Sequence, residues 1–121
     1  MKSSLSERLL FGGIIIALLS ALIITYGNHF YNPFHFDDDH SIVSNTWIRD
    51  LKNVPRFFVD GKTSSSLPAN QSYRPGLTTL NAIDYAIAAK DPLSIGPNIL
   101  YPTEAGLKPF YFHLSIFTSY L

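Results

Sequence analysis

The 121-residue chain contains no cysteine, so the sequence excludes disulfide bonds and zinc sites built on cysteine. Nine basic and nine acidic residues give a formal net charge of zero, so no excess of positive charge favours a nucleic-acid partner. Only 15% of the residues are charged, while 14% are aromatic, which is apolar for a soluble domain of this size. The composition therefore favours a membrane protein and argues against nucleic-acid binding.

One long segment near the start carries no formal charge. No Asp, Glu, Lys or Arg occurs between Arg8 and Asp37, and residues 9–26 read LLFGGIIIALLSALIITY. As a helix rising about 1.5 Å per residue, this run would extend roughly 27 Å, close to the thickness of the hydrocarbon core of a bilayer. The sequence therefore predicts a transmembrane helix over residues 9–27, in contact with membrane lipid.

Two other interpretations of this segment are weaker. A cleaved signal peptide would share the basic start and the apolar core, but residues 23–32 offer no Ala-x-Ala pattern for cleavage. A buried core helix would need more surrounding chain than the remaining residues provide. Because Lys2 and Arg8 precede the span, we expect residues 1–8 in the cytoplasm and residues 28–109 on the external side, periplasmic or lumenal. The predicted aromatic belt at the outer interface consists of Tyr26, Phe30, Tyr31, Phe34 and Phe36.

The external region, residues 28–109, is expected to form loops with short amphipathic helices. Asn45 is a predicted N-cap for a helix that ends near Pro55. Residues 61–72 are polar and rich in serine, which predicts a flexible loop. The apolar side of the helix after Asn45 would comprise Trp47, Leu51 and Val54.

A second helix is predicted over residues 75–90, with an apolar stripe that either packs or lies at the membrane interface. Residues 91–109 hold four prolines and two glycines and are expected to form a connection. Residues 110–121 are apolar but would extend only about 18 Å as a helix, so they predict the start of a truncated second transmembrane helix. The fold class expected is thus an α-helical membrane protein fragment. The apolar stripe of the helix predicted over residues 75–90 comprises Leu77, Leu80, Ile83 and Ile87.

An acidic cluster follows the predicted span, where residues 35–45 read HFDDDHSIVSN. A carboxylate at this place can act as a general base or help to hold a cation. His35 and His40 flank the acids, so a divalent cation is conceivable, although such histidines more often cap turns or face solvent. The cluster alone is also compatible with a solvated turn.

Three motifs occur in a characteristic order. Phe36-Asp37-Asp38 begins the pattern F-D-D-x-x-x-I-x-x-N, Tyr73-Arg74-Pro75 follows, and residues 109–114 read PFYFHL. This order resembles the amino-terminal part of the multi-spanning GT-C glycosyltransferases. It is closest to the protein O-mannosyltransferase-like branch, which includes the transmembrane tetratricopeptide-repeat mannosyltransferases. Ile116 and Tyr120 depart from the asparagine and histidine that members of this family often carry after the His113 element.

The resemblance implies transfer of a sugar from a polyprenyl-phosphate donor to a hydroxyl of a protein or glycan acceptor. It implies Asp37 or Asp38 as the catalytic base, with Asp37 preferred. Arg74 would bind the departing phosphate, with a structural ion pair as the alternative, and Tyr73 would line the sugar site or simply pack. A fragment of this length is expected to be inactive alone. The alternative is a single-span anchored protein whose external segment binds a partner or a cation without catalysis.

Overall fold

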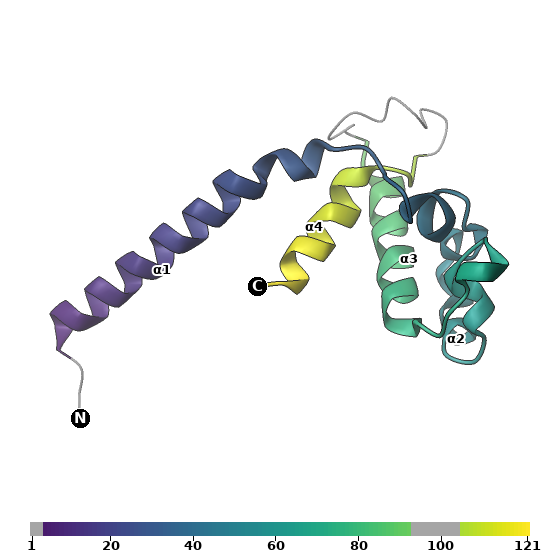
Figure 1. The fold of residues 1–121 in the computed structure, drawn as a ribbon, viewed down its shortest axis with the longest axis horizontal. Helices are drawn as coiled ribbons and strands as arrows, with labels where there is room; N and C mark the ends of the chain where they lie inside the picture. The colour runs from purple at the N-terminus through teal and green to yellow at the C-terminus, as the bar shows by residue number, and fades with distance from the viewer. Residues whose placement is uncertain (1–3, 93–104) are drawn as a thin grey trace.

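The structure, a computed structural model, describes residues 4–92 and 105–121, and every regular element in these ranges is helical (Figure 1). This confirms the predicted helical class at its coarsest level. Short 3-10 and π turns connect the longer elements. The α-helices in the described ranges are α1 (Leu5–Tyr26), α2 (Val54–Phe57), α3 (Pro75–Lys90) and α4 (Pro109–Ser119).

Helix α1 begins four residues before the predicted span because a capping box fixes its first turn. The Ser4 side chain accepts a hydrogen bond from the Glu7 backbone N–H at 3.3 Å, and the Glu7 carboxylate accepts one from the Ser4 N–H at 2.8 Å. The 3-10 turn η1 (Gly27–Tyr31) continues the helix. The run Leu5–Tyr31 is the one described helix that is long and apolar enough to span a membrane, and its most apolar window has a mean hydropathy of 2.5.

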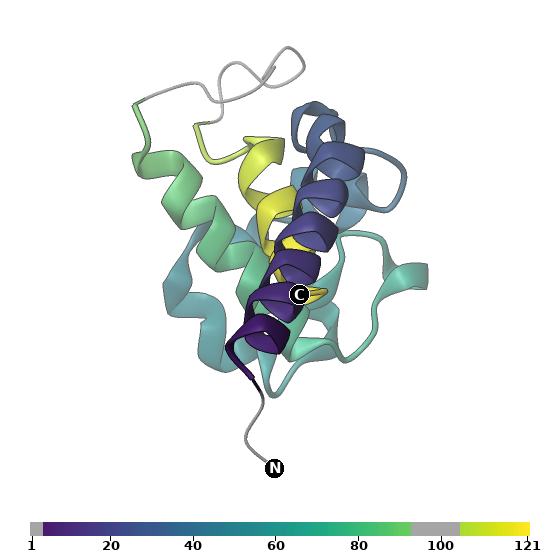
Figure 2. The same cartoon turned by 90° about the vertical axis from the view of Figure 1, so that its left-hand side faces the viewer.

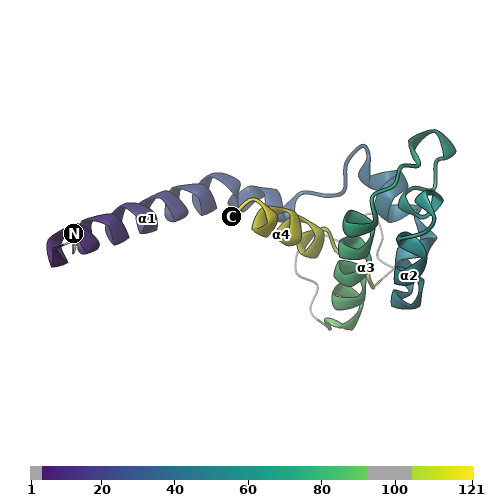
Figure 3. The same ribbon diagram turned by 90° about the horizontal axis from the view of Figure 1, so that it is seen from below.

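Helix α1 projects away from the rest of the described chain (Figure 1), and Figure 2 looks along it from its amino-terminal end. Helix α3 lies across the direction of α1, whereas α4 packs on η1 and runs back toward the side of α1 (Figure 3). Helix α3 contacts α2 and α4 and the 3-10 turn η3 (Thr46–Arg49), and α4 also contacts η1. The compact part of the described chain therefore lies beyond the carboxyl end of α1.

The apolar core sits between α3, α4 and the turns that precede α2. Phe34 packs edge-on against Phe112 of α4, with ring centroids 5.3 Å apart, so its predicted place in an exposed aromatic belt is wrong. Tyr26, Tyr31 and Phe36 are exposed, as a belt requires. The buried core residues are Phe34, Ile42, Ile48, Phe57, Ala82, Leu107 and Phe112.

The single amphipathic helix predicted after Asn45 is wrong, because the segment breaks into η3, η4 (Leu51–Asn53) and α2. Asp50 is extended, with φ −133° and ψ 122°, and its side chain accepts a hydrogen bond from the Lys52 N–H at 2.9 Å. Pro55 lies in the first turn of α2, where a missing N–H costs nothing, rather than at a helix end. Ile48 and Phe57 consequently point inward, and Leu51 is exposed.

Helix α3 confirms the predicted bounds, but its apolar stripe faces away from the described core. Leu77, Ile83 and Ile87 are exposed, so packing within the described chain is the wrong interpretation for them. A place at the membrane interface stays a prediction. Small and polar side chains occupy the packed face because they let η3 and α4 approach closely: Thr78, Asn81, Ala82, Asp84 and Ala88.

The polar tract 61–72 is not a loose loop. It forms the 3-10 turns η5 (Gly61–Ser64) and η6 (Pro68–Asn70), with Thr63 and Ser65 buried. The predicted connection 91–109 falls largely on residues 93–104, which lie outside the described residues. Helix α4 begins one residue before the predicted start of a second span, which itself stays a prediction.

Asp84 is a buried acid between α3 and α4. It is 4% exposed, and its Oδ1 accepts a hydrogen bond from the Ser115 hydroxyl at 2.5 Å. Burial raises the pKa of Asp84 to about 6, against the smaller opposing effect of the Ser115 hydrogen bond. Because the folded-state pKa lies above the unfolded value, ionising Asp84 destabilises the fold progressively as the pH rises from about 4 through about 6.

Asp84→Asn is therefore expected to stabilise the protein by about 1–2 kcal/mol at pH 7.5 and to leave its stability unchanged at pH 4. The amide keeps an oxygen for Ser115 but carries no charge to bury. Thermal unfolding of the chain in detergent micelles, followed by circular dichroism at both pH values, measures the difference. Asp39→Asn, at an exposed acid, is the control and should show no such pH dependence. A stabilisation of equal size at both pH values would contradict the burial argument.

Candidate functional site

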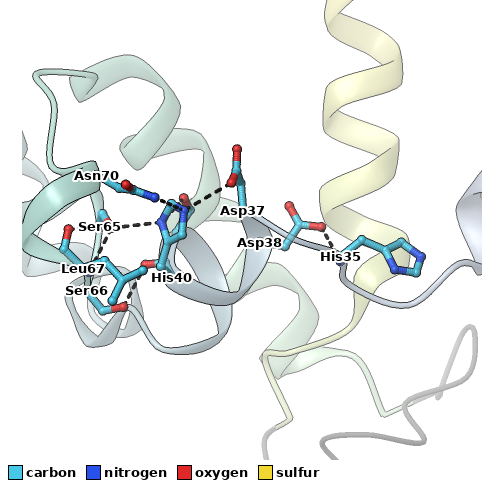
Figure 4. Close-up of polar contacts among 9 residues, drawn as sticks. His35, Asp37, Asp38, His40, Ser65, Ser66, Leu67 and Asn70 are labelled. Atoms are coloured by element: carbon cyan, nitrogen blue, oxygen red, sulfur yellow. Dashed lines mark hydrogen bonds and ion pairs between the residues drawn. The ribbon is translucent and has the colours of Figure 1, made fainter.

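A strained turn carries the acidic cluster. Phe36 has a φ of +45°, a left-handed backbone conformation that is uncommon for a bulky residue and costs about 1–2 kcal/mol. Its side chain is 96% exposed, so no packing explains the strain. The turn sends the next two side chains in different directions, Asp37 toward His40 and Asp38 toward His35 (Figure 4).

The two predicted catalytic aspartates occupy different environments. Asp38 accepts a hydrogen bond from the His35 backbone N–H through Oδ2 at 2.9 Å, which closes the turn. The Asp37 side chain is 93% exposed, and its Oδ1 lies 3.5 Å from Nε2 of His40. Asp38 therefore stabilises the backbone of the turn at residues 35–38, and Asp37 is the carboxylate that a substrate can reach.

His40 is held on both ring nitrogens. It lies in the π turn η2 (Asp39–Val43) and is 9% exposed. Its Nδ1 lies 2.9 Å from the Ser65 hydroxyl and 3.1 Å from the Ser41 hydroxyl, and its Nε2 lies 2.8 Å from the Asn70 amide. The backbone N–H of Ser66 donates to the His40 carbonyl at 2.9 Å. The polar tract 61–72 thus folds around this imidazole (Figure 4).

The Asn45 side chain makes hydrogen bonds to the same turns. Its Oδ1 accepts from the Trp47 N–H at 3.1 Å, which confirms the predicted N-cap. Its Nδ2 donates to the carbonyls of Ser41 at 3.2 Å and Thr63 at 3.0 Å. One buried amide therefore links η2, η3 and η5, and with them the segments that carry His40 and its partners.

A small polar cavity of about 40 Å³ opens between η2, the tract 61–72 and the start of α3. Asp37 and Arg74, predicted as base and phosphate ligand from separate motifs, both line it. Its size suits one or two water molecules or hydroxyl groups, not a whole sugar ring. The other polar residues at its wall are His40, Ser41, Ser64, Asn70, Ser72, Thr78 and Asn81.

Arg74 and Tyr73 differ in their surroundings. The Arg74 backbone forms the N-cap of α3, and its carbonyl accepts from the Thr78 N–H at 3.0 Å. In the part of the chain that the structure describes, the Arg74 guanidinium has no hydrogen bond or ion pair, so the alternative of a structural ion pair finds no partner there. The Tyr73 hydroxyl donates to the Phe58 carbonyl at 2.9 Å, and Tyr73 does not line the cavity.

The order Ser65–His40–Asp37 is that of a hydrolase triad, but the exposure is reversed. Ser65 is 2% exposed and cannot meet a substrate, whereas Asp37 is open to solvent. The end of this chain of contacts that solvent reaches is therefore the Asp37 carboxylate. A carboxylate can accept a proton from a hydroxyl, and a guanidinium can bind an anion.

The divalent cation that the sequence leaves conceivable finds no set of ligands among the described residues. His35 and His40 point in different directions (Figure 4). Within residues 4–92 and 105–121, no group of three or more histidine and acidic side chains is arranged to hold a metal. The cation stays a prediction.

His113 lies apart from this cavity. It is 5% exposed and stacks on His29, with ring centroids 4.3 Å apart and an interplanar angle of 29°. Its Nδ1 has no hydrogen-bond partner among the described residues. The stacked pair connects α4 to η1, so His113 is a buried contact rather than an exposed interface residue.

Comparison of the chain with models of protein families, with curated proteins and with solved structures found no match. The resemblance to GT-C glycosyltransferases therefore stays a prediction from the three motifs. In the structure, two of these motifs each contribute a residue to the lining of one cavity, Asp37 from the first and Arg74 from the second.

Proposed function

We propose that the chain is the amino-terminal part of a membrane glycosyltransferase that moves a sugar from a polyprenyl-phosphate donor to an acceptor hydroxyl. The observation that carries this proposal is the cavity that both Asp37, with its accessible carboxylate, and Arg74 line. The two residues come from different motifs, and the resemblance gives them complementary roles.

Asp37 is the proposed base. A hydroxyl is a weak nucleophile until its proton is being removed, and a carboxylate about 3 Å away can take that proton in the transition state. The acceptor oxygen then bonds to the anomeric carbon, and the bond to the lipid phosphate breaks with its electron pair staying on the phosphate. Attack from the side opposite the leaving group inverts the anomeric centre. Asp38 is the weaker candidate because the His35 N–H already occupies its carboxylate.

Arg74 is the proposed ligand of the departing phosphate. The phosphate gains negative charge as the bond breaks, and a planar guanidinium with paired donors suits a phosphate group. The absence of a side-chain partner for Arg74 within the described ranges supports this role, because the guanidinium need not break an existing contact to bind.

The arrangement around α1 supports the required position at a membrane surface. A polyprenyl donor keeps its tail in lipid and its phosphate at the interface, so the base must lie just outside the bilayer. The cavity belongs to the compact part beyond the carboxyl end of α1, and α3 lies across α1 with an exposed apolar stripe (Figures 1 and 3). With residues 1–8 in the cytoplasm, the cavity would lie on the external side, and α4 would begin the second span.

Single cysteine substitutions test the proposed orientation in the membrane, because the chain has no cysteine of its own. An impermeant thiol reagent added to intact cells should label Asp39→Cys, whereas Ser6→Cys should react only after permeabilisation. Membranes that carry the product of the complete reading frame should transfer labelled sugar from a polyprenyl-phosphate donor. Labelling of Ser6→Cys alone would overturn the orientation. Absence of transfer from any such donor would favour the alternative, a single-span anchored protein that binds a partner without catalysis.

A further inference from the structure

We infer that His40 is the positioning residue for the Asp37 carboxylate. The inference deepens the proposed function and rests on it for its catalytic meaning, but the contact itself is a property of the folded chain. An exposed aspartate has two free side-chain torsions, and a base that acts on one hydroxyl needs a fixed direction. Among the described residues, only His40 can fix the direction of the Asp37 carboxylate, because the one side-chain contact of Asp37 is with His40.

The imidazole is rigid enough to act as a support. It is buried, and contacts come to it from Ser41 in its own turn and from Ser65 and Asn70 in the polar tract. Ser66 fixes its backbone, since both the N–H and the hydroxyl of Ser66 donate to the His40 carbonyl, at 2.9 and 3.2 Å. His40 and Asp37 both line the cavity, and it is Nε2 of the ring that lies 3.5 Å from Oδ1 of Asp37.

The contacts at Nδ1 decide which nitrogen carries the proton. The Ser65 oxygen accepts from the Leu67 N–H at 3.0 Å, and the Ser65 hydroxyl proton can go to His40 Nδ1 at 2.9 Å or to the Leu67 carbonyl at 3.3 Å. The shorter distance favours His40. With a second hydroxyl, that of Ser41, also in reach, Nδ1 accepts and the ring proton resides on Nε2.

A proton on Nε2 has two neighbours, Asp37 and Asn70. For both to accept it, the Asn70 side chain must turn its oxygen toward the ring, which exchanges two atoms of nearly identical shape. The Nε2–H then bonds to Asn70 at 2.8 Å and attracts Oδ1 of Asp37 electrostatically at 3.5 Å, which leaves the second carboxylate oxygen for the acceptor hydroxyl. The other charged group at this cavity is Arg74, which faces the same space from the start of α3.

The tautomer of His40 is the first test, and it needs no sugar transfer. The chain is labelled with ¹⁵N-histidine, placed in detergent micelles, and examined by long-range ¹H–¹⁵N correlation, with His40 assigned through His40→Gln. We expect the Nε2–H tautomer in the unmodified chain and loss of that preference in Ser65→Ala. An Nδ1–H tautomer in the unmodified chain would overturn the inference, because Nε2 would then present no N–H to the Asp37 carboxylate.

Sugar transfer by the product of the complete reading frame is the second test. His40→Gln keeps a donor near the Nε2 position, and His40→Leu removes it at similar volume. We expect His40→Leu to lower kcat about 100-fold with an unchanged KM for the donor, and His40→Gln to stay within about fivefold of the unmodified protein. Equal losses in both variants would indicate a purely structural role and overturn the inference.

Failure of the proposed function can be distinguished from failure of the inference about His40. If Asp37→Asn retains full activity, the proposed base is wrong and the proposed function falls with it. The tautomer measurement still decides the contact between His40 and Asp37 in that case, because it is made on the folded chain without substrate. Circular dichroism of each variant in micelles separates a loss of kcat from a loss of fold.

Discussion

Asp37→Asn is expected to lower kcat for sugar transfer by about 10²–10⁴-fold, the range that a general base contributes. The amide has almost the same shape as the carboxylate but cannot take a proton from the acceptor hydroxyl. Because the side chain is 93% exposed, the fold should not change, and binding of the donor should be retained. Initial rates with a labelled polyprenyl-phosphate sugar, measured over a range of donor concentrations, separate kcat from KM.

The neighbouring acids provide matched controls. Asp38→Asn keeps an oxygen for the His35 N–H and should retain activity within about tenfold, since it preserves the turn without supplying a base. Asp39→Asn changes an exposed acid at the start of η2 and should retain full activity. A loss in Asp38→Asn as large as that in Asp37→Asn would mean that the base had been assigned to the wrong carboxylate.

The elements that the sequence predicted well are those with a strong local signal. Residues 9–26 form one uninterrupted apolar run of helical length, and α1 covers them. Helix α3 was predicted with its observed bounds, because Pro75 suits a first turn and the apolar residues recur at helical spacing. Asn45 was identified as an N-cap from its residue type and position alone.

The direction of each helix face could not be predicted in the same way. The stripe on α3 has the period of a packed face, yet Thr78, Asn81 and Asp84 occupy that place. Periodicity says that one side differs from the other but not which neighbour lies on either side. The apolar side is free in the described chain because α4 and η3 come close only where the α3 side chains are small or can make hydrogen bonds.

The sequence predicted some residues of the candidate site but not the contacts that hold them. Asp37 and Arg74 stand in motifs with fixed spacing, so residue type and order were enough to select them. Ser65 and Asn70 contact His40 across 25 and 30 residues, and no spacing rule connects a serine-rich tract to a distant histidine. The left-handed Phe36 was equally hidden, since residue type alone predicts the opposite conformation. Long-range contacts and strain depend on the whole fold.

Gly106→Ala is expected to destabilise the fold by about 3 kcal/mol, because the position has no space for a methyl group. A Cβ atom there would lie 2.4 Å from two ring carbons of Tyr85, and the site is buried. Tyr85 cannot move freely, since the Arg49 guanidinium lies over its ring at 4.6 Å. Arg49 also donates to the carbonyls of Ile42 and Val43, at 2.9 and 2.6 Å, so the displacement would reach the turn that holds His40.

Thermal unfolding in micelles measures this loss, with Gly76→Ala as the matched control. Gly76 is exposed in the first turn of α3 and has no atom within 4 Å of a new Cβ, so alanine there should be neutral or stabilise by about 0.5 kcal/mol. Tyr85→Ala in the Gly106→Ala background should recover part of the loss, because it removes the clashing ring. If the double variant lost the full sum of the two single effects, the clash with Tyr85 would not be the cause, and the close packing of residues 105–108 against α3 would need another explanation.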